Sequence, residues 1–191
     1  LVMMHFSDNS LHELKTGELI QDIKQEKGFL TCGPVIDNNI IVDQQSELIK
    51  RNTQMKIPYI IGSTSEDIFP PIVYLMAKSY LKKAKKNNPN VYQYFFNHQL
   101  PGDNYGAWHS SDLFYFFGTL SSSWRPMSDV DYKLSDVMVK HICEFAKNSK
   151  PNDDWTSGNK EVMIFGNGKY EIKSKINSNS SKIFLLKLLI K

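Results

Sequence analysis

The sequence predicts an α/β fold built around a parallel sheet. Two apolar runs, residues 57–61 and 91–96, lack the alternation of a half-buried strand, so both are typical of strands buried on both faces. A stretch with helical periodicity separates these runs, and a second such stretch follows the later one. Strand, helix, strand and helix in this order favour parallel strands that are joined by a crossover helix.

Size and composition fit one globular domain. The 191 residues are 41% hydrophobic and 12% aromatic, which is enough to bury a core. A net charge of +3 is too near neutral to predict a nucleic-acid or membrane partner, and we expect neither. Cys32 and Cys143 lack the spacing of a metal or redox motif, so we expect buried free thiols and no metal or cofactor.

The two ends carry no targeting or membrane-spanning pattern. The first seventeen residues lack a basic start followed by an apolar run, so the location stays open, with the cytoplasm favoured. The apolar stretch 183–190 is too short to cross a bilayer. We expect one domain over residues 1–173, followed by a polar linker and a short apolar tail over residues 174–191.

The first half of the chain leads up to one strand and one long helix. Residues 1–28 have apolar spacings that suit a pair of short helices, residues 34–37 begin a turn-rich stretch, and 46–51 form a short helix. The strand 57–61 stops at Gly62, and a polar loop follows it. Prolines at 70 and 71 suit the start of the next helix. Its apolar stripe consists of Ile72, Val73, Met76, Ala77, Tyr80, Leu81 and Ala84.

Four lysines end this helix, at positions 82, 83, 85 and 86. Cations there complement the partial negative charge of the last helical carbonyls. A solvated helix end is therefore favoured over a nucleic-acid patch.

The second half repeats the pattern and closes with a hairpin. Residues 91–96 are rich in strand-forming types, and a glycine-containing loop follows to residue 109. Ser128 or Asp129 caps a helix that extends to about residue 147. The Asn167-Gly168 pair favours a tight turn between strands 162–165 and 169–172.

An acid and a histidine follow the two predicted parallel strands. Asp67 or Glu66 comes after the first strand and His109 after the second, so both groups could meet at one sheet edge. A histidine oriented by a carboxylate is the base that a serine nucleophile needs. Among the other histidines, we interpret His141 as a packing residue and find no partner for His98. His5 and His12 lie in a poorly defined segment.

Residues 106–118 read Gly-Ala-Trp-His-Ser-Ser-Asp-Leu-Phe-Tyr-Phe-Phe-Gly. This segment closely resembles the region around the catalytic histidine of type-B carboxylesterases, the family that includes cholinesterases and para-nitrobenzyl esterases. Residues 34–37, 60–67 and 134–147 are similar to further segments of the family, in the family's order. The resemblance extends over roughly residues 30–166.

The resemblance implies the C-terminal portion of an α/β-hydrolase sheet, with its last strands and flanking helices. His109 matches the catalytic histidine, Asp67 matches the triad glutamate, and Asp112 matches a supporting acid. Asp67 is shorter than that glutamate, and Ile68 replaces the usual glycine, so Glu66 stays open as the alternative acid.

The family's nucleophile motif, Gly-x-Ser-x-Gly, occurs nowhere in the chain, and no two glycines are adjacent as its oxyanion loop would need. We therefore expect a C-terminal fragment of a serine carboxylesterase that is inactive alone. Its partner would be the missing N-terminal half, from the same gene or a separate chain, and its substrate a small carboxylic ester of unknown identity. The alternatives are a non-catalytic, cholinesterase-like interaction protein and an unrelated small α/β binding domain.

Overall fold

The computed structural model describes residues 35–158, 160–166 and 169–173. The chain splits into two compact units, Leu1–Glu47 and Leu48–Lys191. In the described part of the first unit, Asp37 closes a turn because its Oδ1 accepts the backbone N–H groups of residues 39–41, each at 2.9 Å. This turn-rich stretch was predicted, and helix α2 (Gln45–Arg51) follows it. The helices expected in residues 1–28 lie outside the described residues.

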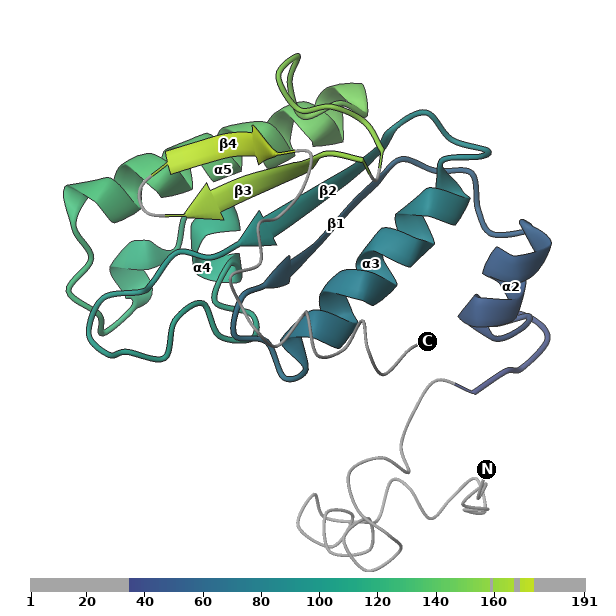
Figure 1. Ribbon diagram of the computed structural model, residues 1–191, viewed down its shortest axis with the longest axis horizontal. Coiled ribbons are helices and arrows are strands. Elements are labelled where there is room, and N and C mark those ends of the chain that lie inside the picture. Colours follow the sequence, from purple (N-terminus) through teal and green to yellow (C-terminus); the bar gives the residue numbers. More distant parts are fainter. Residues whose placement is uncertain (1–34, 159, 167–168, 174–191) are drawn as a thin grey trace, which may run out of the picture. The chain divides into compact units, whose positions relative to one another are not determined.

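The second unit contains a four-stranded sheet in the order β1-β2-β3-β4 (Figure 1). The first three strands are parallel, and β4 pairs with β3 in the antiparallel direction. Helix α3 connects β1 to β2, while α4, η2 and α5 lie between β2 and β3 in the chain, which confirms the predicted α/β fold with a crossover. The bounds are β1 (Tyr59–Thr64), α3 (Pro70–Ala84), β2 (Val91–Phe96), α4 (Leu113–Phe116), η2 (Leu120–Ser122), α5 (Asp129–Asn148), β3 (Val162–Gly166) and β4 (Lys169–Lys173).

Helices cover both faces of the sheet, with α3 on one side and α4 and α5 on the other (Figure 1). Strand β2 serves both layers because its side chains alternate between the faces. Tyr92 and Phe96 belong to the main core, with α4 and α5, whereas Val91 packs with Leu81 of α3. Burial on both faces explains why this strand reads as a continuous apolar run.

Strand β1 differs from the prediction, which ended it at Gly62. Pairing continues through Ser63 and Thr64, which lie opposite Phe95 and Phe96 in the parallel register. Gly62 lies opposite Tyr94, and a Cβ at this glycine would overlap the tyrosine ring. Glycine in this strand therefore permits a close approach of the neighbouring side chain and does not end the strand.

Helix α5 begins and ends close to where the sequence predicted. The backbone N–H of Ser128 donates to Asp131 Oδ2 at 2.8 Å, which supports the N-terminus of the helix. Leu134, Met138 and His141 lie on its buried face. Cys143 is a free thiol as predicted, but the prediction of burial was wrong: it is exposed, because the position two residues after His141 lies on the outer side of the helix. Cys32 lies outside the described residues.

The closing hairpin is confirmed by the antiparallel pairing of β3 with β4. Residues 167–168, where the tight turn was predicted, lie outside the described residues, as does the predicted tail 174–191. The division between a domain ending at 173 and that tail stays a prediction.

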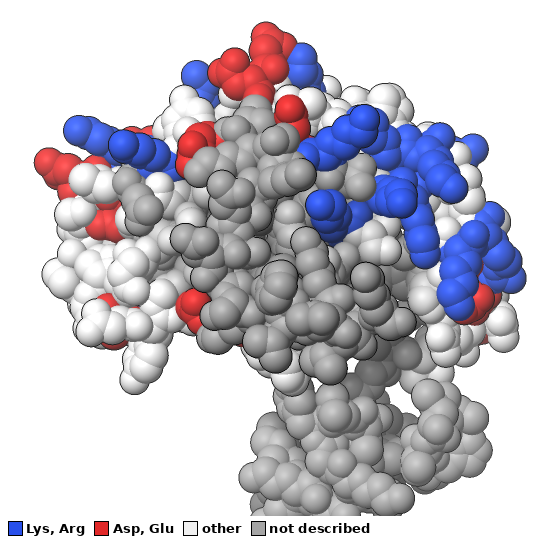
Figure 2. Space-filling model, viewed as in Figure 1, with Lys and Arg blue, Asp and Glu red and all other residues white. Residues whose placement is uncertain are grey.

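Basic side chains gather at the C-terminal end of α3 (Figure 2). Lys82, Lys85 and Lys86 are exposed there, and Lys85 Nζ donates to the carbonyl of Ser157 at 2.6 Å.

No helix in the described part of the chain is long and apolar enough to cross a membrane. Within the same residues, no cluster of three or more metal-binding side chains occurs.

Candidate active site

Two loops meet at the carboxyl ends of β1 and β2. The backbone N–H of Ser65 donates to Phe96, and that of Glu66 donates to Ala107, both at 2.9 Å. Glu66 also forms a parallel bridge with Trp108, so strand-like pairing continues beyond the sheet. Gly106 permits this approach: its φ is +70°, and a Cβ there would lie 2.7 Å from the Glu66 side chain. The backbone therefore fixes the acid loop against the histidine loop.

These loops bring Asp67 and His109 into contact. Oδ1 of Asp67 lies 2.7 Å from Nδ1 of His109 and also accepts the backbone N–H of Ile68 at 2.8 Å. The Asp67 side chain is 8% exposed, whereas that of His109 is 58% exposed. Burial acts to raise the pKa of Asp67, but the hydrogen bonds from Ile68 and His109 outweigh burial and hold it below the usual value. Asp67 is therefore ionised at neutral pH.

An ionised carboxylate can only accept hydrogen bonds, so it requires a proton on His109 Nδ1. In the neutral ring this leaves Nε2 without a proton and able to act as a base. Among the described residues, no side chain or backbone group forms a hydrogen bond with Nε2. The geometry thus presents a solvent-accessible imidazole whose tautomer is set by a buried carboxylate.

Asp112, the predicted supporting acid, precedes α4 and is buried. Its Oδ2 accepts the hydroxyl of Tyr94 at 2.6 Å. Burial raises the pKa of Asp112, and the Tyr94 hydrogen bond offsets this only in part. Tyr94 in turn packs against Gly62, Phe116 and Phe165. Asp112 therefore connects the start of α4 to β2 through Tyr94.

The alternative acid, Glu66, is exposed, and its backbone N–H pairs with Ala107. His109 Nδ1 donates its hydrogen bond to Asp67. Of the two acids left open by the sequence, Asp67 is thus the one in contact with the imidazole.

The remaining described histidines are buried. His141 packs against Trp155, Phe165 and Tyr170, as expected for a packing residue, and burial lowers its pKa. The interpretation of His98 was wrong: its Nε2 lies 2.8 Å from Asp131 Oδ1. No sequence pattern indicated this pair, because the two residues are far apart in the chain and meet only through tertiary packing. His5 and His12 lie outside the described residues.

An apolar hollow of about 420 Å³ lies on the histidine loop and α4. The sequence did not predict it. Trp108 and Ser110, the two neighbours of His109, contribute to its wall. Leu113, Phe114, Phe117 and Thr119 complete the lining.

A carboxylate follows one parallel strand and an imidazole follows the next, so both lie at one edge of a sheet with helices on both faces. This is the arrangement of an α/β-hydrolase. The model of the carboxylesterase family matches residues 71–184, which is more than half of the chain. The chain belongs to the carboxylesterase family, as the resemblance predicted.

Solved esterases share the fold. A PNB esterase superposes with a TM-score of 0.66 at 17% identity, over 91% of this chain and 50% of its own. A thermophilic PNB esterase gives a TM-score of 0.68 at 16% identity, with 93% and 50% covered. For EstA of Aspergillus niger the TM-score is 0.64 at 14% identity, with 82% and 44% covered. Identities this low show the fold alone, and the chain spans about half of the length of these esterases.

Proposed function

We propose that this chain supplies the acid and the base of a serine carboxylesterase. The observation that carries the proposal is the 2.7 Å contact between His109 Nδ1 and the buried carboxylate of Asp67, together with the exposed imidazole. In this role Nε2 of His109 accepts the proton of the serine hydroxyl as the serine attacks the ester carbonyl, and later returns it to the leaving alcohol. Asp67 holds the required tautomer and stabilises the imidazolium ion.

The nucleophile and the oxyanion donors would come from a partner segment outside these 191 residues. Two observations support this: the sequence contains no Gly-x-Ser-x-Gly, and esterases of the same fold are about twice as long. The substrate class that fits is a small carboxylic ester. Asp112 would act as a support, because it contacts the Tyr94 hydroxyl and not His109.

Two linked measurements test this proposal. The gene is read upstream of the codon for Leu1 in all three frames, and we expect a segment that encodes Gly-x-Ser-x-Gly. Hydrolysis of p-nitrophenyl acetate is then compared for the 191-residue chain and for a protein that joins it to that segment. We expect turnover only in the joined protein, and a loss of at least about a thousandfold on His109→Gln.

Saturable turnover by the 191-residue chain, abolished by His109→Gln, would contradict the need for a partner segment. An unchanged rate for His109→Gln in the joined protein would contradict the role of His109. Absence of turnover in the joined protein would favour the non-catalytic interaction protein.

A further inference from the structure

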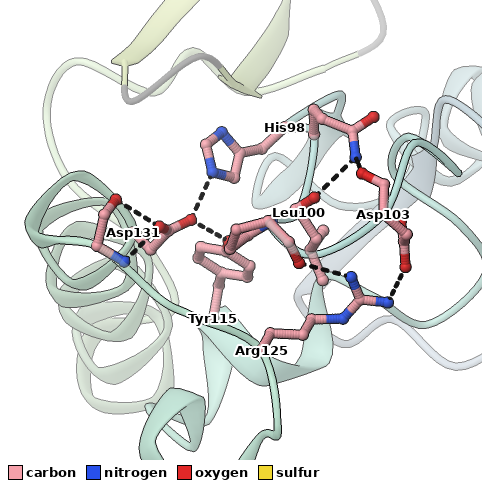
Figure 3. A network of polar contacts seen from close by, with 9 residues as sticks. His98, Leu100, Asp103, Tyr115, Arg125 and Asp131 are labelled. Atoms are coloured by element: carbon pink, nitrogen blue, oxygen red, sulfur yellow. Dashed lines mark hydrogen bonds and ion pairs between the residues drawn. The ribbon is translucent and has the colours of Figure 1, made fainter.

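One carboxylate contacts both ends of the chain segment that carries His109. Oδ1 of Asp131 lies 2.8 Å from Nε2 of His98 and accepts the hydroxyl of Tyr115 at 2.7 Å (Figure 3). His98 lies two residues after the end of β2, and Tyr115 lies in α4, so His109 is on the segment between these two contacts.

The second oxygen of Asp131 holds the carboxylate in place. Oδ2 accepts the backbone N–H of Ser128 at 2.8 Å and its hydroxyl at 2.6 Å, at the start of α5. Four donors therefore fill most of the acceptor capacity of one carboxylate. The Asp131 side chain is 4% exposed, so its removal would leave buried donors on His98 and Tyr115 without an acceptor.

Hydrogen bonds also stabilise the first part of this segment. Gln99 Nε2 donates to the carbonyls of Leu100 and Asp103 at 2.7 and 2.8 Å, and Gln99 Oε1 accepts the N–H of Gly106 at 2.9 Å. Arg125 donates to the carbonyl of Pro101 at 2.7 Å and pairs with the Asp103 carboxylate (Figure 3). After Gly106, the backbone of Ala107 and Trp108 pairs with Glu66. These contacts link the His98 end of the segment to the loop that carries His109.

We propose that Asp131 is a positioning residue, whose carboxylate fixes both ends of the histidine segment so that His109 Nδ1 faces Asp67. Asp131 contacts neither His109 nor a reacting atom, and it acts through His98 and Tyr115. This inference rests on the proposed function and adds to it the residue that keeps the base oriented.

The test measures the tautomer of His109 by ¹⁵N NMR on the protein that joins this chain to its serine-bearing segment, with His109→Asn to assign the signals. In the wild type we expect mainly the Nδ1–H form and an observable, downfield Hδ1 resonance. Asp131→Asn and Tyr115→Phe should each reduce the Nδ1–H fraction at least twofold and broaden or remove the Hδ1 resonance.

Ser128→Ala is the matched control, because it removes a donor from the other oxygen of the same carboxylate. It should lower stability and leave the His109 signals at their wild-type values. If Asp131→Asn does not fold, Tyr115→Phe decides the test, since it removes only a hydroxyl.

Asp67→Asn separates this inference from the proposed function. If Asp67→Asn leaves the His109 signals unchanged, the Asp67–His109 pair fails, and the proposed function fails with it. If Asp67→Asn abolishes the Hδ1 resonance while folded Asp131→Asn and Tyr115→Phe keep it, only the positioning role of Asp131 is overturned.

Discussion

At the scale of single residues, a short acid reaches His109 because the backbone brings the two loops together. Asp67 is one methylene shorter than a glutamate, but pairing of Glu66 with Ala107 and Trp108 draws the two loops close. The acid also receives the N–H of Ile68, the residue at the position where the family usually has glycine. The substitution that left the choice of acid open in the sequence is thus compatible with a formed pair.

The acid stability of the fold should depend on Asp131. Burial acts to raise the pKa of Asp131, but hydrogen bonds from Ser128, His98 and Tyr115 outweigh it and lower the pKa from 3.8 to about 2. A lowered pKa stabilises the ionised folded state, so this contribution is complete above about pH 4 and is lost as pH falls toward 2. The shift corresponds to roughly 2 kcal/mol.

We therefore expect the free energy of unfolding, measured with urea at pH 5 and pH 2.5, to fall less in Asp131→Asn than in the wild type. Asn cannot titrate, so the difference between the two proteins isolates this residue. An identical pH dependence of both proteins would show that Asp131 carries no such linkage.

The Tyr94 hydroxyl should stabilise the buried Asp112. Tyr94→Phe removes the donor 2.6 Å from Asp112 Oδ2 and leaves a buried carboxylate without it. We expect a loss of about 1–3 kcal/mol in urea unfolding. Tyr132→Phe, at an exposed position on α5, is the control and should change stability by less than about 0.5 kcal/mol. Equal, small effects of both substitutions would mean that the Asp112 contact is weak.

At the scale of elements, sequence periodicity was sufficient to predict the bounds of helices and strands whose apolar pattern depends on their own burial. Strand Val91–Phe96 and helix Asp129–Asn148 match their predicted ranges because their apolar residues reflect burial directly. The end of β1 was wrong, since the role of Gly62 depends on Tyr94 of another strand. The Ser128-x-x-Asp131 spacing indicates a helix start, but pairing of Asp131 with His98 depends on packing across 33 positions.

Gly62→Ala tests the close contact between β1 and β2. The added Cβ would overlap the Tyr94 ring, which is fixed by its hydrogen bond to Asp112 and by Phe116. We expect destabilisation of about 1–3 kcal/mol by overpacking, measured by thermal and urea unfolding. Ile61→Val, next to it in the strand, should cost at most about 1.5 kcal/mol. A Gly62→Ala protein as stable as the wild type would show that Tyr94 moves freely.

At the scale of the whole molecule, the described part of the chain exposes several large apolar side chains. Ile68 and Phe69 are exposed just before α3. Met76, which the sequence predicted on the apolar stripe of α3, is exposed, because it lies on the outer side of the helix. Leu113 and Phe117 are exposed on and just after α4. Among the described strands, none pairs with the outer edge of β1. Apolar patches and open strand edges favour association with another chain.

The isolated 191-residue chain should therefore self-associate or have low thermal stability. We expect binding of an apolar dye and an apparent mass above that of a monomer in size-exclusion chromatography with light scattering. Phe117→Ser and Met76→Gln should reduce dye binding. A monomer with a cooperative thermal transition and no dye binding would contradict this expectation.

The pairing of Asp67 with His109 as the acid and base of ester hydrolysis is tested most directly by comparing two neighbouring acids. In the protein that joins this chain to its serine-bearing segment, kcat/KM for p-nitrophenyl acetate is measured for Asp67→Asn and Glu66→Gln. Asp67→Asn should lower it by at least about a hundredfold, because the His109 tautomer is then no longer set by an ionised acceptor, and Glu66→Gln by less than about threefold. The reverse order, or an equal effect of both substitutions, would contradict the assignment of Asp67 as the acid.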